Sequence, residues 1–262
     1  MNISMPRFGV VLAVALACGC SSAQPDSQSP EQSSALDWVN PFIGSAGRGW
    51  YAGSVFVGAT TPFGLVQAGP DTRPANELVP WPFDHCSGYH ATDNTIRAFT
   101  HTHLHGAGIP AFGVVGFMPV SGPFSNGILD SGYASSFDKA SETAEPGYYS
   151  VTLDNAALKA ELTTTTRAAH HRYTPIQDGA QVVTFLVDTA HVISLAKVLD
   201  SEISNKDGVI EGWTHVSSSF SNSFGGVRTY FSAKIRNTIS AAGLWGEGPE
   251  RGAWNTVELA PG

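Results

Sequence analysis

The sequence predicts an all-β protein built as a large antiparallel β-sandwich. Apolar and polar residues alternate with a period of two over several short runs, as they do in strands with one buried face. Glycine, proline and asparagine separate these runs, which is typical of turns. Only 14% of the 262 residues are charged, whereas there are 28 glycines and 16 prolines, a composition common in extracytoplasmic β-rich proteins.

The expected strands follow one another from the start of the folded sequence near residue 36. In chain order they cover residues 55–57, 65–67, 112–118, 148–153, 158–167, 182–187 and 231–236. The run 112–118 is almost continuously apolar, which indicates a strand buried on both faces. Asp154-Asn155 supplies a turn signal between two strands. For residues 188–200 the sequence pattern favours neither helix nor strand.

Residues 1–20 predict a lipoprotein signal peptide. Arg7 gives a short basic region, and the apolar run from Phe8 to Ala17 is too short to span a bilayer. Small residues before a cysteine resemble a bacterial lipobox, so Cys20 is the expected lipidation site and Cys18 the alternative. An ordinary cleaved signal is the other interpretation. We expect an extracytoplasmic bacterial lipoprotein, in the periplasm or at the cell surface, held to the membrane by a lipid anchor.

Residues 21–35 predict a flexible tether, because they contain almost no large apolar side chain. Residues 36–262 predict a single folded domain. After processing at Cys20, Cys86 has no intrachain partner, so stability must come from the core. The last residues carry neither a polar tail nor a closing element, and we expect the chain to be truncated there.

The charge distribution argues against a nucleic-acid partner. The chain has a net charge of −8, and its lysines and arginines form no cluster.

Histidines are concentrated in the stretch from Gly88 to Pro119. Phe99, His101, His103 and His105 fall at every second position, which predicts that they share one face of a strand and meet a polar partner. Zinc binding through the three histidines is one interpretation, although no fourth ligand is evident. A structural histidine pair is the other.

Six short motifs occur in order between residues 39 and 119: VNPFIG, GATTPFG, PDT, SGYH, HTHL and MP. In this order they resemble the N-terminal domain of glycoside hydrolase family 92, the calcium-dependent, exo-acting α-mannosidases. The later motifs PGYYS at 146–150 and HRY at 171–173 extend the resemblance, which runs from Trp38 to the end of the chain.

The resemblance implies a galactose-mutarotase-like supersandwich that packs against a C-terminal (α/α)6 barrel domain of the same protein. It also implies an inverting mechanism, in which a glutamic acid protonates the leaving oxygen and an aspartate acts as base with calcium. Family members carry these carboxylates and the calcium ligands mainly in the barrel. We therefore expect no catalytic residue in this chain.

The resemblance also implies that this domain supplies part of the sugar pocket. The family usually carries a tryptophan just before Cys-Ser-Gly-Tyr-His. Phe83 has the matching spacing, whereas Trp81 stands two residues earlier in a proline-rich variant of the loop. The expected substrate-binding residues are Trp81, Phe83, Asp84, His101 and His103. Packing of Trp81 on the sandwich is the alternative for that residue.

The favoured function is therefore the N-terminal domain of a secreted or lipid-anchored α-mannosidase that trims mannose from glycans and is inactive without its barrel. A stand-alone carbohydrate-binding lipoprotein is the main alternative. A metal-dependent hydrolase built on the histidine strand is the third.

Overall fold

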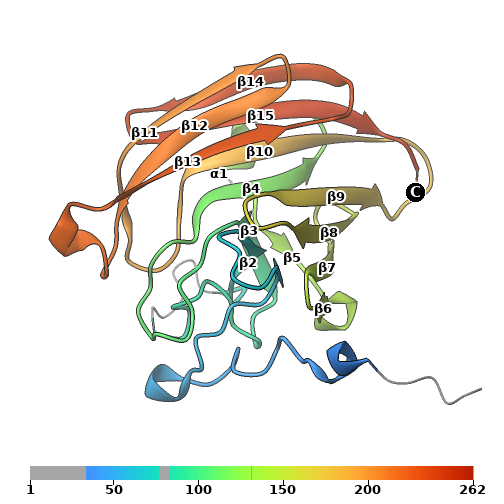
Figure 1. Ribbon diagram of the computed structural model, residues 1–262. Helices are drawn as coiled ribbons and strands as arrows, with labels where there is room; N and C mark the ends of the chain where they lie inside the picture. The colour runs from blue at the N-terminus through green and yellow to red at the C-terminus, as the bar shows by residue number, and fades with distance from the viewer. Residues whose placement is uncertain (1–33, 77–82, 131, 262) are drawn as a thin grey trace, which may run out of the picture. The chain divides into compact units, whose positions relative to one another are not determined.

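The computed structural model describes residues 34–76, 83–130 and 132–261. Every element below belongs to the compact unit that residues 35–262 form. This unit is built almost wholly from antiparallel strands, which confirms the predicted β-sandwich (Figure 1).

The largest sheet has eight strands. Seven of them lie in the order β1-β2-β3-β4-β10-β15-β14, and β5 pairs with β3 at the side. Their bounds are Ala59–Thr60 (β1), Gln67–Arg73 (β2), Thr95–Thr100 (β3), Val114–Ser121 (β4), Ser135–Ser136 (β5), Gln181–Val192 (β10), Ile239–Glu247 (β14) and Glu250–Leu259 (β15).

Two smaller sheets accompany the large one. The first contains β6 (Thr143–Glu145), β7 (Tyr148–Leu153), β8 (Leu158–Thr164) and β9 (Ala169–Pro175). The second contains β11 (Lys197–Lys206), β12 (Val209–Ser217) and β13 (Val227–Lys234). The helical elements are short: α1 (Asn126–Asp130) and the 3-10 turns η1 (Ala35–Trp38), η2 (Gly49–Tyr51), η3 (Lys139–Ser141) and η4 (Asn222–Phe224). No helix in the described ranges combines the length and the apolar character that a membrane span requires.

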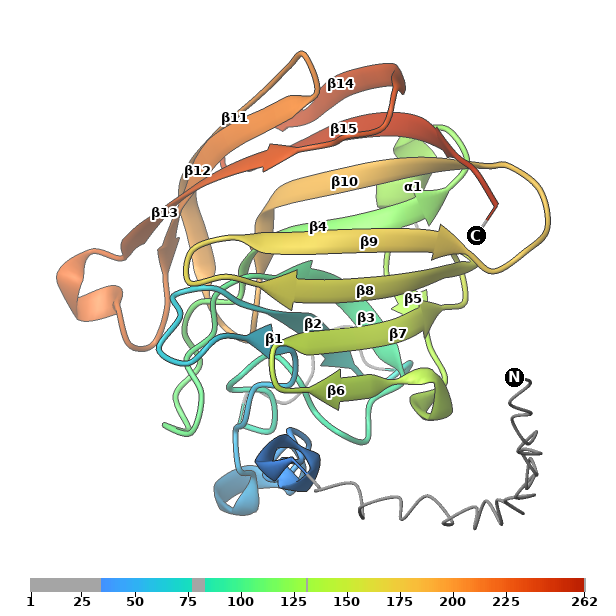
Figure 2. The ribbon, with the colours of Figure 1, turned by 45° about the vertical axis from the view of Figure 1, so that its right-hand side comes forward.

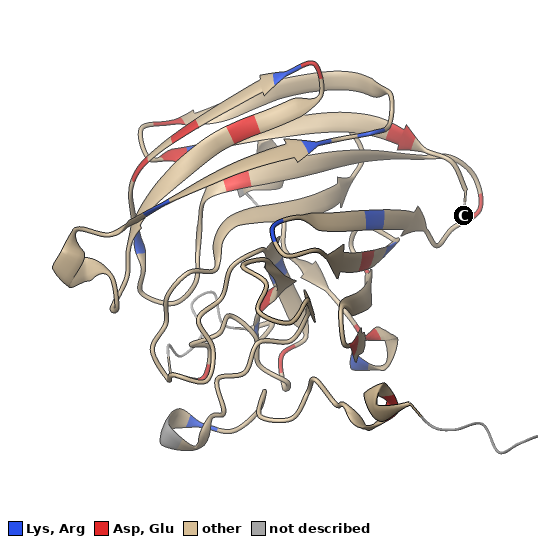
Figure 3. Cartoon of the chain, viewed as in Figure 1, with Lys and Arg blue, Asp and Glu red and all other residues tan. Residues whose placement is uncertain are grey.

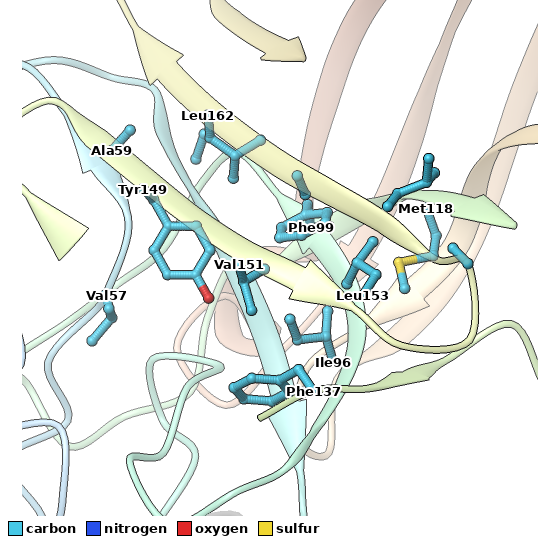
Figure 4. Close-up of a cluster of buried hydrophobic side chains, with 14 of the residues drawn as sticks. Val57, Ala59, Ile96, Phe99, Met118, Phe137, Tyr149, Val151, Leu153 and Leu162 are labelled. Atoms are coloured by element: carbon cyan, nitrogen blue, oxygen red, sulfur yellow. The ribbon is translucent and has the colours of Figure 1, made fainter. Parts of the chain in front are cut away.

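The sheet β6–β9 covers β1 to β4 and encloses the larger of two cores, as Figure 2 shows from the front. Phe99 and Met118 of the large sheet meet Tyr149, Val151 and Leu153 of β7 in this core (Figure 4). Each of these five side chains is at most 2% exposed.

A second core lies between the sheet β11–β13 and the strands β4, β10 and β15. Val187 of β10 and Ala253 of β15 pack there with Ile203 of β11 and Ile210 of β12. Strand β10 serves both cores, since its Val183 belongs to the first and its Val187 to the second.

The predicted strands are largely present, with several differences. Of residues 65–67 only Gln67 lies in a strand, and the strand expected at 158–167 ends at Thr164. Residues 55–57 form no strand, although Val57 is fully buried. Strand β4 starts two residues later than expected, at Val114. The helical alternative for residues 188–200 is wrong, because β10 continues to Val192 and β11 begins at Lys197.

Candidate functional site

Two loops lie beside the ends of β2 and β3, and we call residues 44–54 and 83–93 together the loop platform. They are joined by backbone and side-chain hydrogen bonds. The amide of Ala91 donates to the carbonyl of Ser45 at 2.8 Å, and the amide of Gly49 donates to Asp84 Oδ1 at 2.6 Å. These bonds fix the two loops to each other before any ligand arrives.

Asp84 and Phe83 are the predicted site residues that belong to the loop platform. Asp84 is buried, and its bond to Gly49 uses one of its carboxylate oxygens. Arg48 lies 4.0 Å from the other oxygen, but its side chain is 94% exposed, so this ion pair contributes little. Phe83 is half-buried. Trp81, the third predicted residue of this loop, lies outside the described residues.

His90 closes the loop platform from the second loop. Its Nε2 donates to the carbonyl of Gly47 at 2.7 Å, because a carbonyl oxygen can only accept. Its Nδ1 accepts from the amide of Thr92 at 3.3 Å. The His90 side chain therefore links the two loops of the platform.

Asp71 lies in β2, two residues before its end, against Gly88 of the loop platform, and binds two histidines. His103 Nε2 lies 3.1 Å from Oδ1, and His191 Nε2 lies 2.7 Å from Oδ2. All three side chains are at most 3% exposed. Burial alone would raise the pKa of Asp71, but the two hydrogen bonds from the histidines outweigh it and hold that pKa well below its ordinary value.

The glycine of the Ser-Gly-Tyr-His motif brings the loop against this carboxylate. Gly88 has φ +84°, and a Cβ at this position would lie 2.1 Å from Asp71 Oδ1. Only a glycine allows both the left-handed backbone and the close approach. Gly88 also accepts a hydrogen bond from the amide of Thr72 at 2.7 Å, which seats the loop on β2.

A second buried carboxylate stands beside the first. Asp93 is 1% exposed, and its Oδ2 lies 2.7 Å from both His85 Nε2 and Thr72 Oγ1. The bond from Thr72 ties the second loop to β2, one residue after Asp71. The loop platform is thus joined to β2 at two neighbouring positions, by Gly88 against Asp71 and by Asp93 on Thr72.

Tyr89, the next residue of the motif, anchors the same loop to the segment around η3. Its hydroxyl donates to Glu142 Oε2 at 2.8 Å and accepts from Lys139 Nζ at 2.8 Å. Tyr149 donates to the other oxygen of Glu142 at 2.7 Å. Burial and the nearby carboxylate raise the pKa of Tyr89 far above its ordinary value, so the hydroxyl remains a donor.

The prediction that Phe99, His101, His103 and His105 share one strand face is wrong. Strand β3 ends at Thr100, and the chain then turns away from the extended path. His103 Nε2 reaches back to Thr100 Oγ1 at 2.8 Å, and its Nδ1 donates to the carbonyl of Gln67 at 3.0 Å. His105 is exposed and lies beside Gln67. The three imidazoles therefore do not form the suggested zinc site.

His101 lies between the large sheet and β9. Its Nε2 is 2.8 Å from His171 Nε2, and His171 Nδ1 is 2.8 Å from the hydroxyl of Tyr173. The ring of His101 packs on Phe117 at a centroid distance of 4.5 Å. Burial, and secondarily the charge of His103, lowers the pKa of His101 to about 4. Burial and His101 also lower the pKa of His171 well below its ordinary value.

Three central residues of this arrangement were missed as functional candidates from the sequence. Asp71 and His171 appeared only as parts of motifs, and His191 lies in the segment whose structure was left open. A histidine inside the apolar run of β10 was the available signal for His191, because a buried imidazole needs a polar partner.

The described residues do not fit a calcium site. Within them, no group of three or more His, Cys, Asp or Glu side chains is placed to hold a metal ion. Both oxygens of Asp71 accept hydrogen bonds from histidines. Asp93 Oδ1 has no hydrogen-bond partner among the described residues, but calcium prefers about six to eight oxygen ligands.

The profile of the glycosyl hydrolase family 92 N-terminal domain matches residues 38–259. The chain belongs to this family. The resemblance inferred from the six motifs is thereby confirmed, and the loop platform with its two carboxylates is part of a family 92 N-terminal domain. No match was found among curated proteins.

Solved structures with this fold include a family GH92 alpha-mannosidase from Bacteroides thetaiotaomicron. It is 26% identical with a TM-score of 0.70, over 87% of this chain and 32% of that chain. The same enzyme has also been solved in complex with mannoimidazole. An inverting GH92 mannosidase from Bacteroides thetaiotaomicron VPI-5482 is 21% identical with a TM-score of 0.65, over 87% and 30% of the two chains. This family 92 chain thus spans about a third of the solved structures it matches.

Replacing Asp71 by Asn should destabilise the domain by about 3 kcal/mol, because breaking a buried ion-paired network leaves its partners uncompensated. Urea unfolding monitored by tryptophan fluorescence measures this change. Asp178→Asn, at an exposed turn, is the matched control and should change the free energy of unfolding by less than about 0.5 kcal/mol. Equal effects of the two substitutions would contradict the central role of Asp71.

The pair His101 and His171 should make the domain less stable in acid. Between the ordinary pKa of 6.5 and about 4, the unfolded chain binds protons that the folded His101 does not. The free energy of unfolding should therefore fall as the pH falls through this window. His171→Gln should flatten that dependence between pH 6.5 and 4.5, whereas His170→Gln, on the exposed neighbour, should not. A profile unchanged by His171→Gln would rule out this origin.

Proposed function

We propose that this chain is the N-terminal domain of an exo-acting α-mannosidase that removes mannose from glycans. The observation that carries the proposal is the 26%-identical family GH92 alpha-mannosidase, which shares this fold over 87% of the chain. The alternative is a stand-alone carbohydrate-binding protein, in which the same residues would bind sugar but no glycosidic bond would be cleaved.

In this proposal the loop platform forms one wall of the sugar pocket. Phe83 offers an aromatic ring to the apolar face of a pyranose, in the place that tryptophan takes in the family. Trp81 is the second candidate for that role. Asp84 and His90 hold the loops rigid, so the wall is formed before the sugar binds and little ordering entropy is lost on binding. His103 supports this wall from behind through its bond to Asp71, whereas His101 lies against β9 through His171.

The domain contributes binding and leaves acid–base chemistry to the barrel. An inverting glycosidase needs two carboxyl groups spaced to admit a water molecule, one of them free to give a proton and the other to take one. Asp71 and Asp93 are each engaged by histidines, which supports a structural role for both. We place the glutamic acid, the aspartate base and the calcium ligands in an (α/α)6 barrel of the same protein.

Mannose release from α-mannobiose in the presence of calcium tests the proposal. The 262-residue chain should be inactive, and the same chain joined to its barrel should be active and should lose activity when a chelator removes calcium. In the longer protein Phe83→Ala should raise KM and lower kcat/KM by about fivefold, since stacking on an aromatic ring is worth about 1 kcal/mol. Phe63→Ala, on a side chain that is fully exposed at the β1–β2 turn, is the control. Mannose release by the short chain would refute the division of labour.

We further propose that the protein is exported and lipidated at Cys20, which the sequence of residues 1–20 supports. Membrane fractions of cells expressing the whole chain should contain it, and mass spectrometry should find a diacylglyceryl group on its first residue. Cys20→Ala should move the protein to the soluble fraction. If Cys18→Ala, and not Cys20→Ala, moves the protein to the soluble fraction, the lipid is attached to Cys18. An unmodified wild-type protein in the soluble fraction would exclude lipidation.

A further inference from the structure

The sheet β11–β13 has an outward face with a composition unlike that of its core side. Ile203, Ile210 and Phe231 point inward, and strand alternation turns their neighbours to the opposite side. We call that opposite side the β11–β13 outer face. Its members are Glu202, Ser204, Glu211, Trp213, His215, Arg228, Tyr230, Ser232 and Lys234.

Two aromatic side chains sit side by side at the middle of this face. Trp213 and Tyr230 are direct cross-strand partners, so their Cβ atoms are about 5 Å apart. The ring of Tyr230 is 69% exposed. The indole of Trp213 is half-buried and fixed, because its Nε1 donates to Glu202 Oε2 at 3.1 Å and the guanidinium of Arg228 lies 4.6 Å from its ring centre.

Hydrogen-bonding side chains of both charges surround the aromatic pair. Glu202 and Arg228 lie next to Trp213, and both are exposed. Ser232 and Glu211 flank Tyr230 and Trp213 and are held together by a 3.0 Å hydrogen bond. Acidic and basic residues both occur on this sheet (Figure 3). On the outer face Glu202 and Glu211 are balanced by Arg228 and Lys234, so the face has no field of one sign that would attract a polyanion or a polycation.

We propose that the β11–β13 outer face binds a neutral oligosaccharide at a site separate from the loop platform. The exposed ring of Tyr230 offers its face to the C–H groups of a pyranose, beside an indole that Glu202 and Arg228 hold in place. The carboxylate and guanidinium groups at the rim bond the hydroxyls of the sugar. A neutral ligand rich in hydroxyl groups matches the balanced charge better than a peptide segment or a nucleic acid. The proposal does not rest on the mannosidase activity, because binding is measured here without turnover.

Isothermal titration calorimetry of the 262-residue chain with an α-linked mannotetraose, and in parallel with cellotetraose, tests this site. At least one of the two should bind, and Tyr230→Ala should weaken that binding by about tenfold. Glu202→Gln should weaken it by a smaller factor, because an amide keeps part of the hydrogen bonding. Tyr230 is exposed, so its removal should leave the unfolding midpoint unchanged.

Two control variants separate this site from the loop platform. Phe63→Ala removes an exposed ring at the β1–β2 turn and should leave binding unchanged. Phe83→Ala removes the proposed aromatic wall of the loop platform and should leave the binding measured at Tyr230 intact. No binding of either tetrasaccharide, or binding reduced by Phe83→Ala and not by Tyr230→Ala, would overturn the proposal.

Discussion

The pairing of one buried carboxylate with two imidazoles organises this domain. Asp71, His103 and His191 come from β2, from the segment after β3 and from β10, which lie apart in the sequence and on three different strands or their extensions. An isolated carboxylate at this depth would be strongly destabilising, so each partner is required once Asp71 is present. The loops that form the site rest on this network through Gly88.

The fold was largely predictable from the sequence because strand periodicity and turn residues are local signals. The strand at 148–153 and the core of β10 coincide with their predictions, since both depend on the alternation of a few neighbouring side chains. The path after Thr100 was not predictable in this way. Alternation of Phe99, His101 and His103 imitates a strand, but the bonds of His103 to Thr100, Gln67 and Asp71 bend the chain.

The site itself was predictable only where a family motif marks it. Phe83 and Asp84 lie in the loop platform, as the motif indicated. The physical role of each residue in Ser-Gly-Tyr-His, however, is evident only from the three-dimensional structure. Gly88 is a glycine because of a carboxylate 17 positions earlier in the chain, and Tyr89 is a tyrosine because of a glutamate 53 positions later. No spacing rule connects such residues, because their distance in sequence is set by the topology of the sheets.

Strand β10 links features that were described separately. Its Val183 packs in the first core, its Val187 in the second, and its His191 binds Asp71 under the loops. A shift of this strand by a fraction of an ångström, caused by repacking in either core, would be passed to the carboxylate and then to Gly88. The geometry of the loop platform is therefore set in part by a strand that contributes no residue to it, so substitutions far from the loops can change the positions of their side chains.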